Sequence, residues 1–200
     1  MFAMISRSVR AMAGYCLNAV LLCLLAISSN VSAAEAAPGQ VDTVSRVKAA
    51  FILNIAKFAK WPEAPSLDVE EDFTLCLYQQ NSLGSAIELI EGRSVGALSL
   101  RSRVVDTLSY EDQCHLLFVA AADLPAFHEA LPAVGSLQSL TIVDQTASDN
   151  GGPIPEGVVL ALKRRGERIG FAINLDTASL AGIRFSSELL KLAEIEVREP

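Results

Sequence analysis

Residue types that commonly carry out catalysis are sparse in this 200-residue chain, and their spacing matches no familiar active site. The two histidines, His115 and His128, are well separated in sequence. Ser187 and Lys191 are four residues apart, whereas the serine–lysine motif of penicillin-binding proteins needs a spacing of three. The sequence also contains no phosphate-binding loop, nucleophile elbow or H-E-x-x-H zinc motif. We therefore expect a non-enzymatic protein that needs no metal or cofactor.

The best candidates for binding an anionic ligand are cations in the C-terminal third of the chain. Arg164 and Arg165 lie in a cluster at a predicted hairpin turn, and such a cluster could attract a carboxylate or a phosphate. The same cluster could instead be a solvated turn that protects a sheet edge from unwanted strand pairing. Its members are Lys163, Arg164, Arg165 and Arg168.

A glycine pair and an asparagine are the other ligand-binding candidates. Gly151 and Gly152 lie in a loop rich in turn formers, and long loops often carry function, although this one could be a plain connection. Asn174 lies where a predicted strand meets a helix start, and ligands of open α/β sheets tend to bind beyond strand ends. Asn174 could equally satisfy backbone groups at that turn. Binding at these positions would make the chain a small-ligand-binding protein.

The first 33 residues differ from the rest of the chain and are typical of a secretory signal peptide. Arg7 and Arg10 give a positive start, Ala19–Ile27 is a short apolar run, and small residues lead to Ala33. A transmembrane anchor is the alternative, but the run is well short of the ~20 residues that a span needs. We expect a periplasmic protein whose residues 1–33 are cleaved.

Cleavage would remove two cations and no acidic residue, so the formal net charge would change from −7 to −9. An acidic chain argues against nucleic acid or anionic lipid as the main partner, and we expect no direct membrane insertion after cleavage. Residues 34–41 are rich in small residues and are predicted to be a disordered tail. Residues 42–200 are predicted to form the folded domain.

Two cysteines, Cys76 and Cys114, remain after cleavage. Cys76 lies in the alternating stretch FTLCLY and Cys114 directly precedes the apolar run HLLFVA, so adjacent strands could bring them together. Thiols of an exported chain meet an oxidising compartment, and we predict a structural disulfide. The alternative is a metal or catalytic pair with His115, but these residues lack the spacing of zinc ligands.

The stretch KAAFILNIAKFAKWP (48–62) predicts an amphipathic helix that is capped by Asp42 and ends near Lys60. Leu53 is unusual because the helical pattern places it among cations, opposite the apolar stripe. Trp61 precedes a proline, which ends the helix. We expect the stripe to be core and the opposite side to contact a partner. The stripe is Val44, Val47, Phe51, Ile55 and Phe58, and the expected contact residues are Leu53, Lys57, Lys60 and Trp61.

Strand and helix signals alternate along the rest of the chain, which predicts a mostly parallel sheet covered by helices. Two strands around the turn RRGE predict an antiparallel C-terminal hairpin. Asp176 is the predicted cap of a helical turn that Gly182 ends, and Ser186 is the predicted cap of the last helix. The expected fold is a single three-layer α/β domain with helices on both faces. The predicted strands are 73–80, 97–105, 115–121, 139–144 and the two within 158–175, and the predicted helices are 85–92, 124–134 and 186–195.

The two ends of this pattern resemble the YfiR-like family of bacterial exported proteins. The resemblance is carried by KAAFILNIAKFAKWP (48–62) and GFAINLDTASLAGIRFSSELLKLA (170–193), together with a cysteine in the first strand and a glycine pair before the hairpin. It implies a compact α/β fold and a periplasmic repressor that binds the sensor domain of an inner-membrane diguanylate cyclase. Such binding would lower cyclic di-GMP synthesis and biofilm formation. It also implies that the chain can form a homodimer. A sensor kinase is the alternative inner-membrane partner. The family's best-known member has a second disulfide in its C-terminal half, which cannot form here because no cysteine follows Cys114.

Overall fold

The computed structural model describes residues 42–61, 72–109, 113–134, 138–149 and 152–196. The first described element is helix α2 (Thr43–Phe58). Asp42 caps it as predicted, because the Asp42 carboxylate accepts a hydrogen bond from the backbone N–H of Ser45 at 3.0 Å. The helix ends slightly earlier than predicted, and the next two residues form the short strand β1 (Ala59–Lys60).

The buried face of α2 is rotated from the predicted stripe. Val47 and Phe58 are exposed, at 37% and 46%, whereas Leu53 is only 8% exposed. The predicted stripe contains large side chains alone, whereas the buried face also contains Ala49 and Ala56, which are at most 1% exposed. Leu53 is therefore a core residue, and the expectation that it faces solvent is wrong. The buried residues of α2 are Ala49, Ile52, Leu53, Ile55 and Ala56.

An eight-stranded, mostly parallel sheet dominates the described part of the chain, in the order β10-β8-β7-β6-β5-β2-β4-β3. The β7–β8 hairpin and the β3–β4 pair are antiparallel, and the remaining pairs are parallel. A mixed α/β fold with a C-terminal hairpin is thus what the sequence predicted. The strands are β2 (Asp72–Tyr78), β3 (Ser94–Val95), β4 (Leu98–Val105), β5 (Leu116–Ala120), β6 (Leu140–Asp149), β7 (Leu160–Arg165), β8 (Arg168–Asn174) and β10 (Glu194–Glu196).

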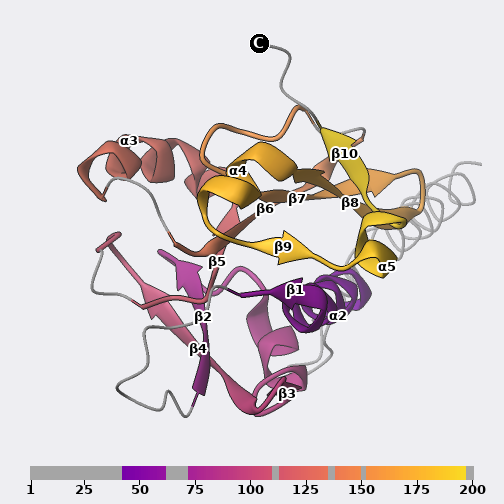
Figure 1. The fold of residues 1–200 in the computed structure, drawn as a ribbon, viewed down its shortest axis with the longest axis horizontal. Helices are drawn as coiled ribbons and strands as arrows, with labels where there is room; N and C mark the ends of the chain where they lie inside the picture. Colours follow the sequence, from indigo (N-terminus) through magenta and orange to yellow (C-terminus); the bar gives the residue numbers. More distant parts are fainter. Residues whose placement is uncertain (1–41, 62–71, 110–112, 135–137, 150–151, 197–200) are drawn as a thin grey trace, which may run out of the picture. The chain divides into compact units, whose positions relative to one another are not determined.

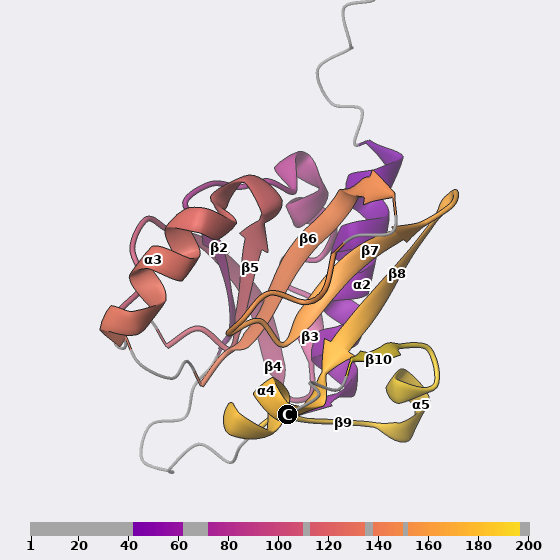
Figure 2. The ribbon, with the colours of Figure 1, turned by 90° about the horizontal axis from the view of Figure 1, so that it is seen from above.

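Each face of the sheet has its own hydrophobic cluster. Successive residues of β2 alternate between them: Leu75 and Leu77 join the cluster that contains the buried face of α2, whereas Cys76 and Tyr78 join the other. The second cluster also contains Phe127 of helix α3 (Leu124–Val134). Helices α2 and α3 therefore cover opposite faces of the sheet, as Figure 2 shows.

The predicted disulfide between Cys76 and Cys114 is confirmed. The two Cα atoms are 5.7 Å apart, and the bond joins β2 to the residues just before the adjacent strand β5. Short 3-10 helices follow two of the parallel strands, at Gly84–Leu89 (η1) and Ala121–Asp123 (η3).

The C-terminal segment differs most from the prediction. Ser186 caps a helix as expected, but this helix, α5 (Ser187–Leu190), is a single turn. The residues after it form β10, which pairs in parallel with β8. Hydrogen bonding to an otherwise open sheet edge favours the extended conformation of Glu194–Glu196 over the helix that the local pattern suggests. The strand β6 also continues to Asp149, into a stretch predicted as loop.

Ion pairs hold β10 across the intervening strand β8. Lys163 of β7 is buried and pairs with Glu196, and Arg165 pairs with Glu194. The other carboxylate oxygen of Glu196 accepts a hydrogen bond from the backbone N–H of Ile154 at 2.8 Å. Two cations of the cluster that was predicted to bind an anion or to form a solvated turn, Lys163 and Arg165, thus attach the last strand.

Candidate protein-binding surface

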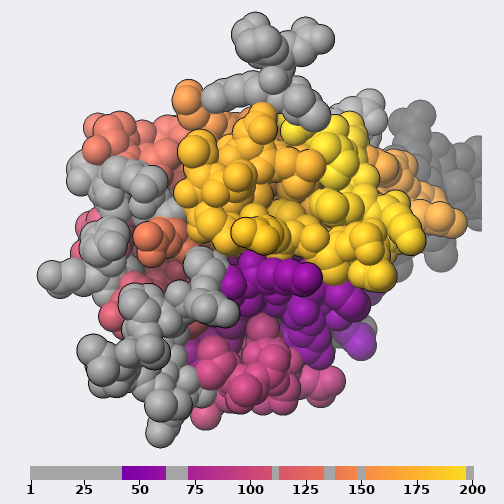
Figure 3. Space-filling model, in the orientation of Figure 1, coloured from indigo at the N-terminus to yellow at the C-terminus, as the bar shows by residue number. Residues whose placement is uncertain are grey.

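The end of α2 meets the C-terminal segment in a two-stranded ribbon. Strand β1 pairs in antiparallel register with β9 (Arg184–Phe185), so that Ala59 is opposite Phe185 and Lys60 is opposite Arg184. The carbonyl oxygen of Phe58 accepts a hydrogen bond from the backbone N–H of Ser186 at 3.1 Å. Figures 1 and 3 show this junction, where the indigo α2 segment borders the yellow C-terminal segment.

Trp61 fixes the chain where it leaves this ribbon. Its indole N–H donates to the carbonyl oxygen of Ala56 at 3.2 Å. The indole ring packs edge-on against Phe73, with ring centroids 5.0 Å apart, and lies 6.2 Å from the ring of His115. Trp61 is half-buried, so it is a structural anchor that keeps part of its surface accessible.

Of the four residues predicted to contact a partner, three lie together and reach the surface. Lys57 and Lys60 are exposed, and Trp61 is half-buried directly after Lys60. Leu53 lies in the core instead. The structure adds Phe58, which the sequence pattern assigned to the core, and Arg184, which only the β1–β9 pairing brings to this place.

Among the described residues, Glu188 lies within electrostatic range of Lys60. Glu188 is exposed at the start of α5, and the backbone amide of Glu188 holds the pKa of its carboxyl below the usual range. The hydroxyl of Ser187 lowers this pKa further, and the charge of Lys60 contributes a smaller attraction. The surface nevertheless carries more positive than negative side chains.

Asn174 satisfies a backbone group at the start of a helix, which was the alternative to ligand binding. It is the N-cap of helix α4 (Leu175–Leu180), and its side-chain oxygen accepts a hydrogen bond from the backbone N–H of Thr177 at 2.9 Å. Its exposed fraction is 8%. The predicted cap, Asp176, instead lies in the first turn of the helix.

The other ligand-binding candidates do not gather around Asn174. Arg165 pairs with Glu194 and Arg164 donates to the carbonyl oxygen of Thr146 at 3.0 Å, both near the hairpin turn at the opposite end of β7 and β8. Gly152 is exposed, and Gly151 lies outside the described residues. These positions therefore do not form one pocket in the part of the chain that the structure describes.

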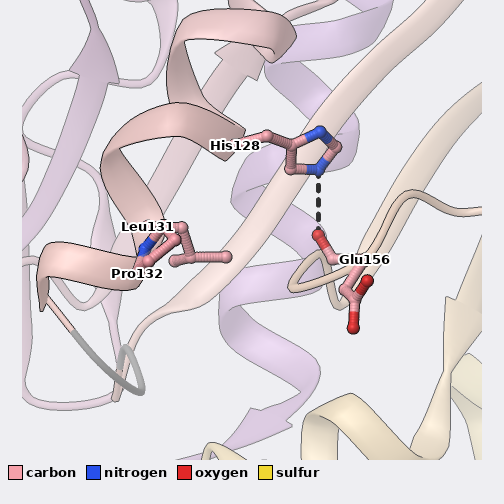
Figure 4. A pocket seen from close by; sticks show the side chains of 4 residues that line it. All are labelled: His128, Leu131, Pro132 and Glu156. Atoms are coloured by element: carbon pink, nitrogen blue, oxygen red, sulfur yellow. Dashed lines mark hydrogen bonds between the residues drawn. The ribbon is translucent and has the colours of Figure 1, made fainter.

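A hollow of about 550 Å³ lies between α3 and the loop before β7 (Figure 4). A ring nitrogen of His128 is 3.0 Å from the carbonyl oxygen of Glu156, so this histidine ties the loop to the helix. The other described lining residues are Leu131 and Pro132, which are apolar. The hollow thus offers an apolar wall and a bonded histidine rather than a catalytic arrangement.

Within the described residues, no group of three or more histidine, cysteine or acidic side chains is placed to hold a metal ion. In the same part of the chain, every helix is too short or too polar to cross a membrane.

The family model described as YfiR/HmsC-like matches residues 45–194. The chain belongs to this family. The search of curated proteins gave no match. The matched range begins in α2 and ends in β10, so it includes the β1–β9 ribbon, Trp61 and the disulfide.

The YfiR/HmsC-like family is known for periplasmic regulators. Membership of this family suggests regulation through a protein partner.

Proposed function

We propose that this chain is a non-enzymatic periplasmic regulator that binds the periplasmic sensor domain of an inner-membrane signalling protein. The proposed target is a diguanylate cyclase, whose output of cyclic di-GMP the bound regulator represses, and biofilm formation falls with it. The proposed contact surface contains Lys57, Lys60 and Trp61.

The observation that carries this proposal is that the fixed side chain of Trp61 lies next to exposed positive charges at the end of α2. The indole of Trp61 is held by a hydrogen bond and two aromatic contacts, while Lys57 and Lys60 next to it point to solvent. A surface held in this way loses little conformational freedom when a partner binds, which favours affinity. Membership of a family known for periplasmic regulators supports a protein as the partner.

The proposal is tested by deleting the gene in its native host and measuring cellular cyclic di-GMP. Deletion should raise cyclic di-GMP, and expression of the full chain with residues 1–41 intact should restore the original level. A version that lacks residues 1–33 should not restore it, because it would stay in the cytoplasm. An unchanged level after deletion, across growth phases and oxidising and reducing media, would contradict the proposal.

Small-ligand binding at Asn174 and the hairpin cations has less support. Asn174 is used as a helix cap and Arg165 is paired with Glu194, so neither offers a free group to a ligand in the described structure.

A further inference from the structure

The β1–β9 ribbon places two cations directly opposite each other. Lys60 is the cross-strand neighbour of Arg184, and both side chains are exposed. Like charges at directly opposite positions destabilise a strand pair. Neither side chain forms an ion pair or a hydrogen bond with any residue that the structure describes, and the charge of Glu188 compensates Lys60 only weakly.

Other cations in the described part of the molecule have acidic partners, unlike Lys60 and Arg184. Two cations that join elements of the fold have acidic partners: Lys48 contacts Asp144 at 2.7 Å, and Lys163 contacts Glu196. The chain has more acidic residues than basic ones, 23 against 16, so acidic partners are not scarce. Among the residues that the structure describes, Glu188 offsets this pair only weakly, so stability does not explain the pair.

Two more residues extend the surface around the pair. Lys57 is exposed three residues before Lys60, and the Phe58 side chain between them is 46% exposed. We call Lys57, Phe58, Lys60 and Arg184 the cationic ribbon end. It combines three positive charges with an exposed aromatic ring on a chain whose formal net charge is −7.

We propose that the cationic ribbon end binds an acidic, extended segment of the partner protein, with an apolar side chain of that segment against Phe58. This inference rests on the proposed function, because it names the chemistry of the partner at the same surface. Charge complementarity argues for an acidic occupant: it speeds encounter and removes the like-charge repulsion between Lys60 and Arg184. Arg184 becomes a specificity-determining residue of the interface.

The test uses the full processed chain and a fluorescently labelled twelve-residue peptide of alternating glutamate and phenylalanine as the probe. Binding is measured by fluorescence anisotropy at several salt concentrations. The variant is Lys60→Gln/Arg184→Gln. The matched control is Arg46→Gln/Arg168→Gln, which removes the same charge from exposed cations at the other end of α2 and at the β7–β8 hairpin turn, far from β9 in Figure 2.

We expect the wild type and the control to bind the peptide, with affinity falling as salt rises. The Lys60→Gln/Arg184→Gln variant should bind at least tenfold more weakly and show a shallower salt dependence. Its thermal midpoint should equal or exceed that of the wild type, because a repulsive pair is removed. Equal binding by variant and control, or no binding by the wild type, overturns the proposal.

Further measurements on the same proteins distinguish the acidic segment from two other possible ligands of this surface, a membrane and a second copy of the chain. Stronger binding of the wild type to phosphatidylglycerol vesicles than to the peptide, lost in the variant, would assign the surface to a membrane and overturn the proposal. Self-association of the wild type in sedimentation, lost in the variant, would assign it to a second copy and also overturn it.

The proposal and the proposed function can fail separately. If gene deletion raises cyclic di-GMP but the Lys60→Gln/Arg184→Gln variant restores repression fully, the function stands and the assignment of this surface is wrong. If deletion changes nothing while the peptide still binds at the ribbon, the surface stands and the regulatory function is wrong.

Discussion

At the scale of single residues, burial separates the two roles of α2. Leu53 and Lys57 are one helical turn apart, yet Leu53 is 8% exposed and packs in the core, whereas Lys57 faces solvent. The stripe of large apolar residues predicts that both side chains lie on the exposed side of the helix. The buried alanines, which that stripe omits, place Leu53 on the buried side. Leu53 therefore contributes to the stability of the fold, whereas Lys57 is available to contact a partner.

Leu53→Ala is expected to lower the free energy of unfolding by about 2–5 kcal/mol, the usual cost of truncating a buried leucine. Lys57→Ala, the matched control, should change it by less than about 0.5 kcal/mol, as at most surface positions. Urea denaturation followed by circular dichroism measures both. Similar effects of the two substitutions would show that the helix is oriented differently.

At the scale of elements, the sequence predicted the strands and the hairpin well because their signals are local. Apolar runs such as LLFVA mark buried strands, and a short turn joins β7 to β8. The β1–β9 ribbon and β10 could not be predicted, since each depends on pairing between distant segments. Arg184 was missed for the same reason: nothing near it in sequence shows that Lys60 lies opposite.

Helix α4 provides a test of which residue caps it. Asn174→Ala should destabilise the protein by about 1 kcal/mol, because the backbone N–H of Thr177 loses its acceptor. Asp176→Ala should cost less, since Asp176 is in the first turn rather than at the cap. Thermal unfolding of the two variants side by side gives the comparison. A larger loss for Asp176→Ala would contradict the assigned cap.

Attachment of β10 depends on the buried end of Lys163. Glu196→Ala should cost about 3 kcal/mol, because it leaves Lys163 buried without its carboxylate. The double variant Lys163→Met/Glu196→Met should cost less, since it removes both charges. Chemical denaturation of single and double variants forms the test. Equal losses would mean that packing of Glu196, rather than its charge, holds the strand.

At the scale of the whole molecule, a disulfide joins β2 to the residues just before β5, and Trp61 packs the end of α2 against the same region. The Cys76–Cys114 bond joins residues that are 38 positions apart, and Trp61 packs on Phe73 and His115, which are close to the two cysteines in sequence. The proposed surface is thus supported by the same region that the disulfide stabilises. The cysteines could be paired from sequence, but the contact of Trp61 with this region could not.

Cys76→Ser/Cys114→Ser is expected to lower the free energy of unfolding by about 3–4 kcal/mol, from the loop-closure entropy returned to the unfolded chain. Fluorescence of Trp61, the chain's single tryptophan, reports the transition. Treatment of the wild type with a reductant should produce the same shift. A variant as stable as the wild type would show that the bond contributes nothing to folding.

The most direct measurement of the central claim is photo-crosslinking in living cells of the native host. A photoreactive amino acid replaces Lys60 in the full exported chain, and Arg168 at the hairpin turn is replaced in the control. We predict that the Lys60 position forms a covalent product with an inner-membrane diguanylate cyclase, through its periplasmic domain, and that the Arg168 position does not. Equal products from both positions, or none with any inner-membrane signalling protein, would contradict the account.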